Sequence, residues 1–313
     1  MAIRIEPLPG GHAFGAVVLG VTGSAIDDPA VQQSLRELWI DKGLLVFRGT
    51  DGERTTQVGL SRIFGEFELH PAAYARLPGH PELTQLHYDP DSGFIVDIDG
   101  DVRGAYLPWH SDLIYVDRIN RGGLLRAVRI PARGGATGFI DQIGLYARLP
   151  ETLKQRIDGL NVIYHADFNP ELKKFGRKVV VKRHVDGAAE RYAEIGRLPY
   201  VAHPMVFAQA ETGRKVLNVS PWFAIAIEGM AAPAGDALLA QVVEHCEDET
   251  NAYYHVWQPG DMVLWDNWRM LHCAYGVPPA ETRTVERTTI KGDYQLGRVL
   301  SGDVIADHLR IEI

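Results

Sequence analysis

The chain has 313 residues, a formal net charge of −8 and 46% hydrophobic residues. This acidic balance argues against nucleic acid or an anionic membrane as a partner, and the hydrophobic content is ordinary for a globular protein with a real core. Two cysteines, Cys246 and Cys273, are too few for a disulfide framework and fit a reducing compartment. No signal-peptide pattern and no apolar run of membrane length occurs, so we expect a cytoplasmic protein.

The first part of the chain is predicted to mix short strands with two helices. Strands are expected at residues 3–6, 14–21 and 44–47. The first helix is predicted to begin at Asp28, with a proline in its first position, and to end at Gly43. The second, at residues 55–64, is predicted to be capped by a threonine. Nothing in these elements carries chemistry on its own.

Residues 89–103 are rich in aspartate and glycine. Their spacing does not fit an EF-hand calcium loop. Two interpretations stay open, which are a lid that substrate orders over a pocket and a plain solvated hairpin.

The pattern H-x-D is the first candidate for a metal site, because residues two apart on a strand project to one side. It occurs four times, as His87/Asp89, His110/Asp112, His165/Asp167 and His184/Asp186. Such a short pattern arises about once by chance in a chain of this length, so context has to choose among the four pairs. Only His110/Asp112 is followed by an apolar predicted strand at residues 113–116, a second strand at 123–130, and a Gly-Gly-x-Thr turn ending at Thr137.

The middle of the chain is predicted to lie outside a barrel of strands. Residues 141–158 look helical with a break at Leu149, and residues 169–202 are polar and partly basic. We therefore expect one domain over residues 1–313 with an inserted helical and loop region at about 141–202. An amphipathic helix is predicted at 236–249. Many short strands with helices attached predict a mainly β fold of the jelly-roll type.

The stretch from 261 to 294 contains an apolar strand, then His272, and then Arg283 and Arg287 in a β-rich run. The two arginines are four apart, so on a strand they point to one face, and an arginine fork suits a carboxylate. With His110 and Asp112, His272 completes two imidazoles and one carboxylate, the facial triad of non-haem Fe(II) oxygenases. The alternative is an exposed strand with surface arginines and a core histidine.

This order of residues, H-x-D, a distant histidine, and arginines eleven and fifteen positions later, resembles the taurine dioxygenase / 2,4-dichlorophenoxyacetate dioxygenase (TauD/TfdA) family. The resemblance covers roughly residues 47–294. It implies a double-stranded β-helix that uses Fe(II) and 2-oxoglutarate, with His110, Asp112 and His272 as the metal ligands. It also implies that Thr137 and Arg283 bind the distal carboxylate of 2-oxoglutarate.

The resemblance further implies hydroxylation of an aliphatic carbon by O₂, with release of succinate and CO₂ and with or without fragmentation of the product. Arg287 would meet the substrate anion or the C1 carboxylate of 2-oxoglutarate, while His70 and Phe223 match substrate-binding positions. Tyr106 stands where the taurine enzyme has an asparagine. We therefore expect a small organic acid, such as an aryloxyalkanoate, a sulfonate or another carboxylate, with a preference for apolar or aromatic groups.

Two other classes are compatible with the same residues. A zinc-dependent hydrolase would use the triad but would leave Arg283 and Thr137 without a role. A non-catalytic jelly-roll binding protein would bind a small acid without consuming O₂. Members of the family are often dimers or tetramers, so a homo-oligomer is expected.

Overall fold

The computed structural model of the protein describes residues 3–69 and 76–301. His70, predicted to contact substrate, lies outside the described residues. Within the described part, no helix is long and apolar enough to cross a membrane.

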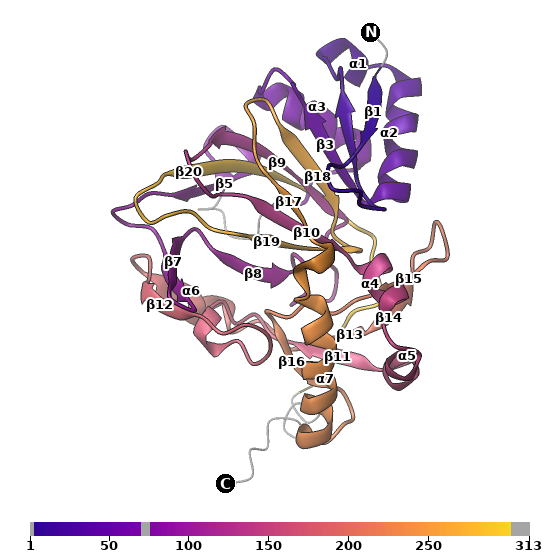
Figure 1. The fold of residues 1–313 in the computed structure, drawn as a ribbon, viewed down its shortest axis with the longest axis vertical. Coiled ribbons are helices and arrows are strands. Elements are labelled where there is room, and N and C mark those ends of the chain that lie inside the picture. The colour runs from indigo at the N-terminus through magenta and orange to yellow at the C-terminus, as the bar shows by residue number, and fades with distance from the viewer. Residues whose placement is uncertain (1–2, 70–75, 302–313) are drawn as a thin grey trace.

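Two sheets lie face to face and form the centre of the fold (Figure 1). The larger one has the strand order β1 (Arg4–Pro7), β2 (Ala16–Leu19), β3 (Leu44–Arg48), β18 (Met262–Asp266), β9 (Gly122–Arg129), β20 (Arg283–Ile290), β5 (His80–Tyr88) and β4 (Arg76–Leu77). The smaller one has the order β17 (Tyr253–His255), β10 (Thr137–Asp141), β19 (Met270–Ala274) and β8 (Leu107–His110). From β8 to β10 and from β17 to β20 the chain alternates between the two sheets, which is the winding of a double-stranded β-helix, and the predicted jelly roll is confirmed.

Strands in the middle of the larger sheet are buried on both faces, which explains their continuous apolar sequence. All five residues of β18 are buried. Leu264 packs with residues of the N-terminal helices α2 (Pro29–Lys42) and α3 (Arg54–Phe64), whereas Val263 packs with Phe139 of the smaller sheet.

The capping residues of α2 agree with the prediction. The Asp28 side chain accepts a hydrogen bond from the backbone amide of Ala30, and Gly43 ends the helix with φ of 73°. The prediction for α3 was wrong in one detail, because its N-cap is Glu53 and no side chain caps it.

The chain leaves the two sheets after β10 and returns at β17, and the residues between them, 142–252, are called the excursion below. The helices α4 (Gln142–Arg148) and α5 (Glu151–Ile157) come first and are separated at Leu149, as predicted. The remaining elements of this excursion are β11 (Asn161–Tyr164), η2 (Pro170–Leu172), β12 (Val180–Arg183), α6 (Ala188–Ile195), β13 (Val201–Pro204), β14 (Val206–Ala208), β15 (Lys215–Leu217), β16 (Ala224–Ile227), α7 (Ala232–Cys246) and η3 (Glu249–Asn251). The helix predicted at 236–249 is α7, and its apolar residues pack in one core with β11 and β16.

Residues 89–103 contain a hairpin, β6 (Ile95–Ile98) and β7 (Asp101–Gly104). Its third strand is β12, which comes from the excursion and pairs antiparallel with β6. The predicted hairpin is therefore present, as part of a small sheet that joins two distant parts of the sequence, while the lid role stays a prediction.

Candidate active site

Two histidines meet where β8 and β19 pair. His110 lies directly opposite His272 in this antiparallel register, so both side chains leave the same face of the smaller sheet. The centroids of their rings are 4.2 Å apart. The strand pairing therefore brings together two residues that are far apart in the sequence.

Asp112 completes the group from a turn rather than from a strand. The strand predicted at residues 113–116 is wrong, because β8 ends at His110 and the chain turns with Leu113 at φ of 55°. The buried Asn267 holds this turn, since its side chain accepts from the Asp112 amide at 2.8 Å and donates to the Asp112 carbonyl at 2.9 Å. These bonds place the carboxylate 3.8 Å from the Nε2 atom of each histidine.

The protonation states of the three side chains fit a divalent metal. His110 Nδ1 donates to the Pro108 carbonyl at 2.7 Å, which leaves the Nε2 lone pair free to act as a ligand. Burial lowers the pKa of His110 and lowers that of His272 to about 3, so both rings are neutral. Burial opposes ionisation of Asp112, but the charged Arg287 guanidinium beside it holds its pKa down, at about 2.

Among the residues that the structure describes, His110, Asp112 and His272 are the one group of three or more possible ligands close enough to share a metal ion. Within the described residues, none of the other three H-x-D pairs belongs to such a group. His87 and Asp89, for example, make only an ion pair at 3.7 Å.

Arg283 and Thr137 meet at one end of the same cavity. Arg283 on β20 is buried, and it donates from Nε to the Gly135 carbonyl at 3.2 Å and from Nη2 to Thr137 Oγ1 at 3.3 Å. Burial lowers its pKa to about 10, and among the described residues its hydrogen-bond partners are a carbonyl and a hydroxyl, with no carboxylate paired to it. Since a buried charge without a counter-ion is costly, this cation suits an anionic ligand.

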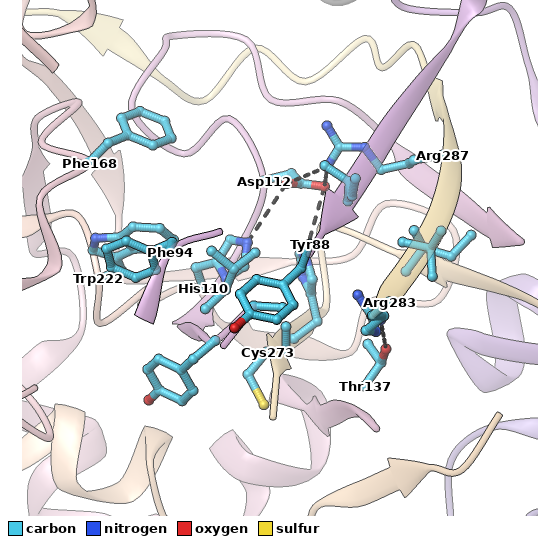
Figure 2. Close-up of a pocket in the computed structure, with 18 of the residues that line it drawn as sticks. Tyr88, Phe94, His110, Asp112, Thr137, Phe168, Trp222, Cys273, Arg283 and Arg287 are labelled. Atoms are coloured by element: carbon cyan, nitrogen blue, oxygen red, sulfur yellow. Dashed lines mark hydrogen bonds and ion pairs between the residues drawn. The ribbon is translucent and has the colours of Figure 1, made fainter. Parts of the chain in front are cut away.

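Arg287 lies four residues further along β20, two repeats of the pleat, on the same face as Arg283, as predicted. Its Nη1 atom is 2.9 Å from both oxygens of Asp112. The two arginines, Thr137 and the three possible metal ligands all line one cavity of about 450 Å³. Figure 2 shows the Asp112 carboxylate between Arg287 and His110.

The opposite end of the cavity is aromatic. In Figure 2, Phe94, Phe168 and Trp222 lie on the far side of His110 from Arg283. Phe223 stacks on Trp222 with ring centroids 4.7 Å apart.

Both aromatic residues predicted to contact substrate line this cavity, Tyr106 at the base of the β6–β7 hairpin and Phe223 beside His110. His110 meets Phe223 edge-on at 6.4 Å between centroids. Burial raises the pKa of Tyr106 above its usual range, so its phenol is neutral.

Several residues of the site were missed by sequence reasoning. They are Phe94, Leu113, Tyr115, Phe168 and Val185 in the cavity wall, and Asn267 behind Asp112. Leu113 and Tyr115 were read as part of a strand, and the other wall residues lie in loops or beside β12, where no periodicity marks a side chain as facing a ligand. A buried asparagine next to a strand end has no distinctive sequence pattern.

Comparison with known proteins adds an independent line of support. The sequence model of the Taurine catabolism dioxygenase TauD, TfdA family matches residues 4–289. The chain belongs to this family. It is therefore a 2-oxoglutarate-dependent dioxygenase that uses Fe(II), and these matches support neither the zinc hydrolase nor the non-catalytic binding protein.

Relatives of this TauD/TfdA protein match along most of its length. It is 31% identical to an (S)-phenoxypropionate/alpha-ketoglutarate-dioxygenase of Sphingobium herbicidovorans, over 93% of this chain and 96% of the relative. It is 29% identical to an alpha-ketoglutarate-dependent 2,4-dichlorophenoxyacetate dioxygenase of a Burkholderia species, over 84% and 86%. The crystal structure of a taurine dioxygenase from Burkholderia xenovorans superposes with a TM-score of 0.70 at 25% identity, over 96% of this chain and 95% of that one.

Proposed function

We propose that His110, Asp112 and His272 hold the Fe(II) of this dioxygenase. The proposal is supported by two neutral imidazoles and one ionised carboxylate whose possible ligand atoms all lie within 4.8 Å of one another. With 2-oxoglutarate and O₂, the bound metal supplies the oxidant that hydroxylates an aliphatic carbon, while succinate and CO₂ are released. The protein's own residues bind, orient and desolvate the reactants.

The distal carboxylate of 2-oxoglutarate is proposed to bind Arg283 and Thr137. The observation that carries this assignment is a buried guanidinium, bonded to a threonine hydroxyl, that makes no ion pair among the described residues and opens on the same cavity as the metal ligands. Charge-assisted hydrogen bonds of this kind contribute roughly 1.5–3 kcal/mol each.

Arg287 is proposed to orient the acidic group of the primary substrate next to the metal. It already bonds the Asp112 carboxylate, so a second anion on this guanidinium would lie within reach of the reacting centre. His70 remains a predicted substrate contact.

The primary substrate is proposed to be a small hydrophobic acid of the aryloxyalkanoate class. The aromatic end of the cavity, including Tyr106, Phe168 and Phe223, offers stacking surface and excludes water, while Arg287 offers the counter-ion. The two relatives compared above act, by their names, on phenoxypropionate and 2,4-dichlorophenoxyacetate. Sulfonates and other carboxylates are the less apolar candidates.

We also propose that residues 1–313 form one dioxygenase domain and that the protein is cytoplasmic. The cytoplasmic location is supported by Cys246 and Cys273, which are both free and buried. A homo-oligomer is proposed from the family resemblance.

The test is an anaerobic titration of Fe(II) and then 2-oxoglutarate into the purified protein, followed by visible absorption. A weak metal-to-ligand charge-transfer band is expected, and it should be lost in the Arg283→Ala protein. O₂ uptake is then measured with phenoxypropionate, 2,4-dichlorophenoxyacetate and taurine. Absence of the band with the metal demonstrably bound would overturn the 2-oxoglutarate assignment, and faster uptake with taurine would overturn the substrate class.

A further inference from the structure

We propose that Trp257 is a positioning residue for the co-substrate. Its indole N–H directs the proton of the Thr137 hydroxyl into the cavity, toward the distal carboxylate of 2-oxoglutarate. The inference rests on the proposed role of Arg283 and Thr137.

The two hydrogen bonds that Thr137 Oγ1 accepts leave its hydroxyl one further interaction, which is donation of its proton. Trp257 Nε1 donates to Thr137 Oγ1 at 3.1 Å, and Arg283 Nη2 donates to the same oxygen at 3.3 Å. A hydroxyl has two lone pairs and one proton, so two accepted bonds leave only the O–H to be used. Among the hydrogen bonds of the described residues, none has this O–H as the donor, and Thr137 lines the cavity.

Trp257 is held firmly enough to impose this direction. It is buried, and its ring meets that of His255 edge-on with centroids 4.6 Å apart. His255 lies directly opposite Thr137 in the pairing of β17 with β10. On the other side, the amide of Gln258 donates to the buried Asp261 at 3.0 Å.

Asp261 is itself fixed to the larger sheet. Arg48 of β3 donates to both of its oxygens, at 3.2 and 3.1 Å. The short segment that carries Trp257 is therefore tied to both sheets, and turning its indole away would break the buried hydrogen bond to Thr137.

The consequence is a cavity end that presents donors alone. Arg283 contributes guanidinium N–H groups and Thr137 contributes an O–H, so a ligand here has to offer acceptor oxygens. A 2-oxo acid with a second carboxylate satisfies this end, whereas one that ends in a methyl group does not. Trp257 should thus affect selectivity among 2-oxo acids, without affecting metal binding.

The test compares two co-substrates of equal chain length in the Trp257→Phe protein, which keeps an aromatic ring and loses the N–H. Dissociation constants for 2-oxoglutarate and 2-oxovalerate are measured by anaerobic titration of the Fe(II)-loaded protein. Loss of one hydrogen bond predicts about 5- to 10-fold weaker binding of 2-oxoglutarate. Binding of 2-oxovalerate and of Fe(II) should stay unchanged.

Two further variants separate this role from simple packing. Trp39→Phe is the matched control, because the Trp39 indole N–H is buried without a hydrogen-bond partner, and it should bind 2-oxoglutarate normally. In a Thr137→Val background, Trp257→Phe should add no further loss, because its effect passes through the hydroxyl. If Trp257→Phe fails to fold, site-specific incorporation of benzothienylalanine removes the N–H while it preserves the shape.

Equal weakening of both 2-oxo acids, or unchanged 2-oxoglutarate binding, would overturn the role of Trp257. Failure of the underlying assignment has a different signature, since Arg283→Ala would then bind 2-oxoglutarate as well as the unaltered protein. Loss of binding in Arg283→Ala with none in Trp257→Phe would reject this inference alone.

Discussion

The two ends of the cavity are built in different ways. At one end, Arg283 projects from β20 of the larger sheet and Thr137 from β10 of the smaller sheet, and Arg283 donates to both Thr137 and the Gly135 carbonyl. At the other end, Phe94, Phe168 and Val185 come from loops beside the hairpin and from the excursion between β10 and β17.

At the aromatic end, side-chain hydrogen bonds to backbone carbonyls link the excursion to the loop before the hairpin. Arg183 of β12 donates to the backbone carbonyls of Gly93 and Pro90 at 2.8 and 2.7 Å, so the excursion holds the segment that leads into Phe94. This difference indicates that the sheets set the shared chemistry, whereas the loops set which substrate fits.

The largest effect on metal binding and turnover is expected at Asp112, where the two ends of the cavity meet. Asp112→Ala removes the one anionic ligand and leaves Arg287 without its partner. Losing a residue that merely orients a ligand already costs about 10- to 100-fold, so we expect a loss of Fe(II) affinity of at least about 100-fold and no detectable turnover. Calorimetric metal titration and O₂ uptake measure both.

The control is Asp186→Ala, which removes the exposed carboxylate of another H-x-D pair. Normal Fe(II) binding by Asp112→Ala would contradict the assigned metal site.

The end of the cavity formed by Arg283 and Thr137 is expected to tolerate substitution less well than the aromatic end. Arg283→Lys keeps the charge but loses the fork that bonds both Gly135 and Thr137. We expect the KM for 2-oxoglutarate to rise about 10- to 100-fold, from the loss of one charged hydrogen bond, with the KM for the primary substrate little changed. Steady-state O₂ uptake at varied 2-oxoglutarate tests this, and an unchanged KM would remove Arg283 from the co-substrate site.

Substitution of Arg287 tests which anion this side chain binds, the acidic group of the primary substrate or the C1 carboxylate of 2-oxoglutarate. In Arg287→Gln we expect the KM for the acidic substrate to rise about 10-fold, because one charge-assisted bond is lost. Binding of 2-oxoglutarate, measured by the charge-transfer band, should weaken less. The opposite order of effects would mean that Arg287 meets the C1 carboxylate instead.

Substitutions at the aromatic end of the cavity should change only the selectivity among primary substrates. Phe94→Ala removes apolar wall and is expected to lower kcat/KM for aryloxy acids about 10-fold, the equivalent of part of a buried phenyl ring. Short aliphatic acids and 2-oxoglutarate should be unaffected. Val180→Ala, at an exposed position on β12, is the matched control. Parallel losses for all acids would argue against a specificity role.

The smallest effect on activity is expected at His203 of β13, which connects the excursion to the turn after Asp112. His203 Nε2 donates to the Val116 carbonyl at 2.9 Å, and burial lowers the pKa of His203 to about 4. Between pH 4 and 6.5 the unfolded chain therefore binds a proton that the folded protein does not.

The stability of the unaltered protein should consequently fall as the pH drops from 6.5 to 4, with His203 contributing up to about 3 kcal/mol of that fall. His203→Gln should be less stable at pH 7 and should lose less stability on acidification. Urea unfolding at pH 7, 6 and 5 compares the two slopes. Identical slopes would show that His203 is not the titrating group.

The sequence by itself determined the residue types of the site and much of the fold. Strand alternation placed Arg283 and Arg287 on one face, because side chains on a strand repeat every two residues. Asp28 and Gly43 marked the ends of α2, because capping is a local property of the backbone. The order of histidine, aspartate and arginine resembles that of the TauD/TfdA family, and this resemblance implied Fe(II) and 2-oxoglutarate.

Only the tertiary structure decided which groups meet. Four H-x-D pairs share one spacing, and sequence context favoured His110/Asp112, but only the pairing of β8 with β19 brought His272 opposite His110. Asp112 reaches the histidines from a turn held by Asn267, not from the strand that its apolar neighbours predicted. The aromatic wall and the contact of Trp257 with Thr137 join segments far apart in the chain, and such contacts depend on packing that no local pattern records.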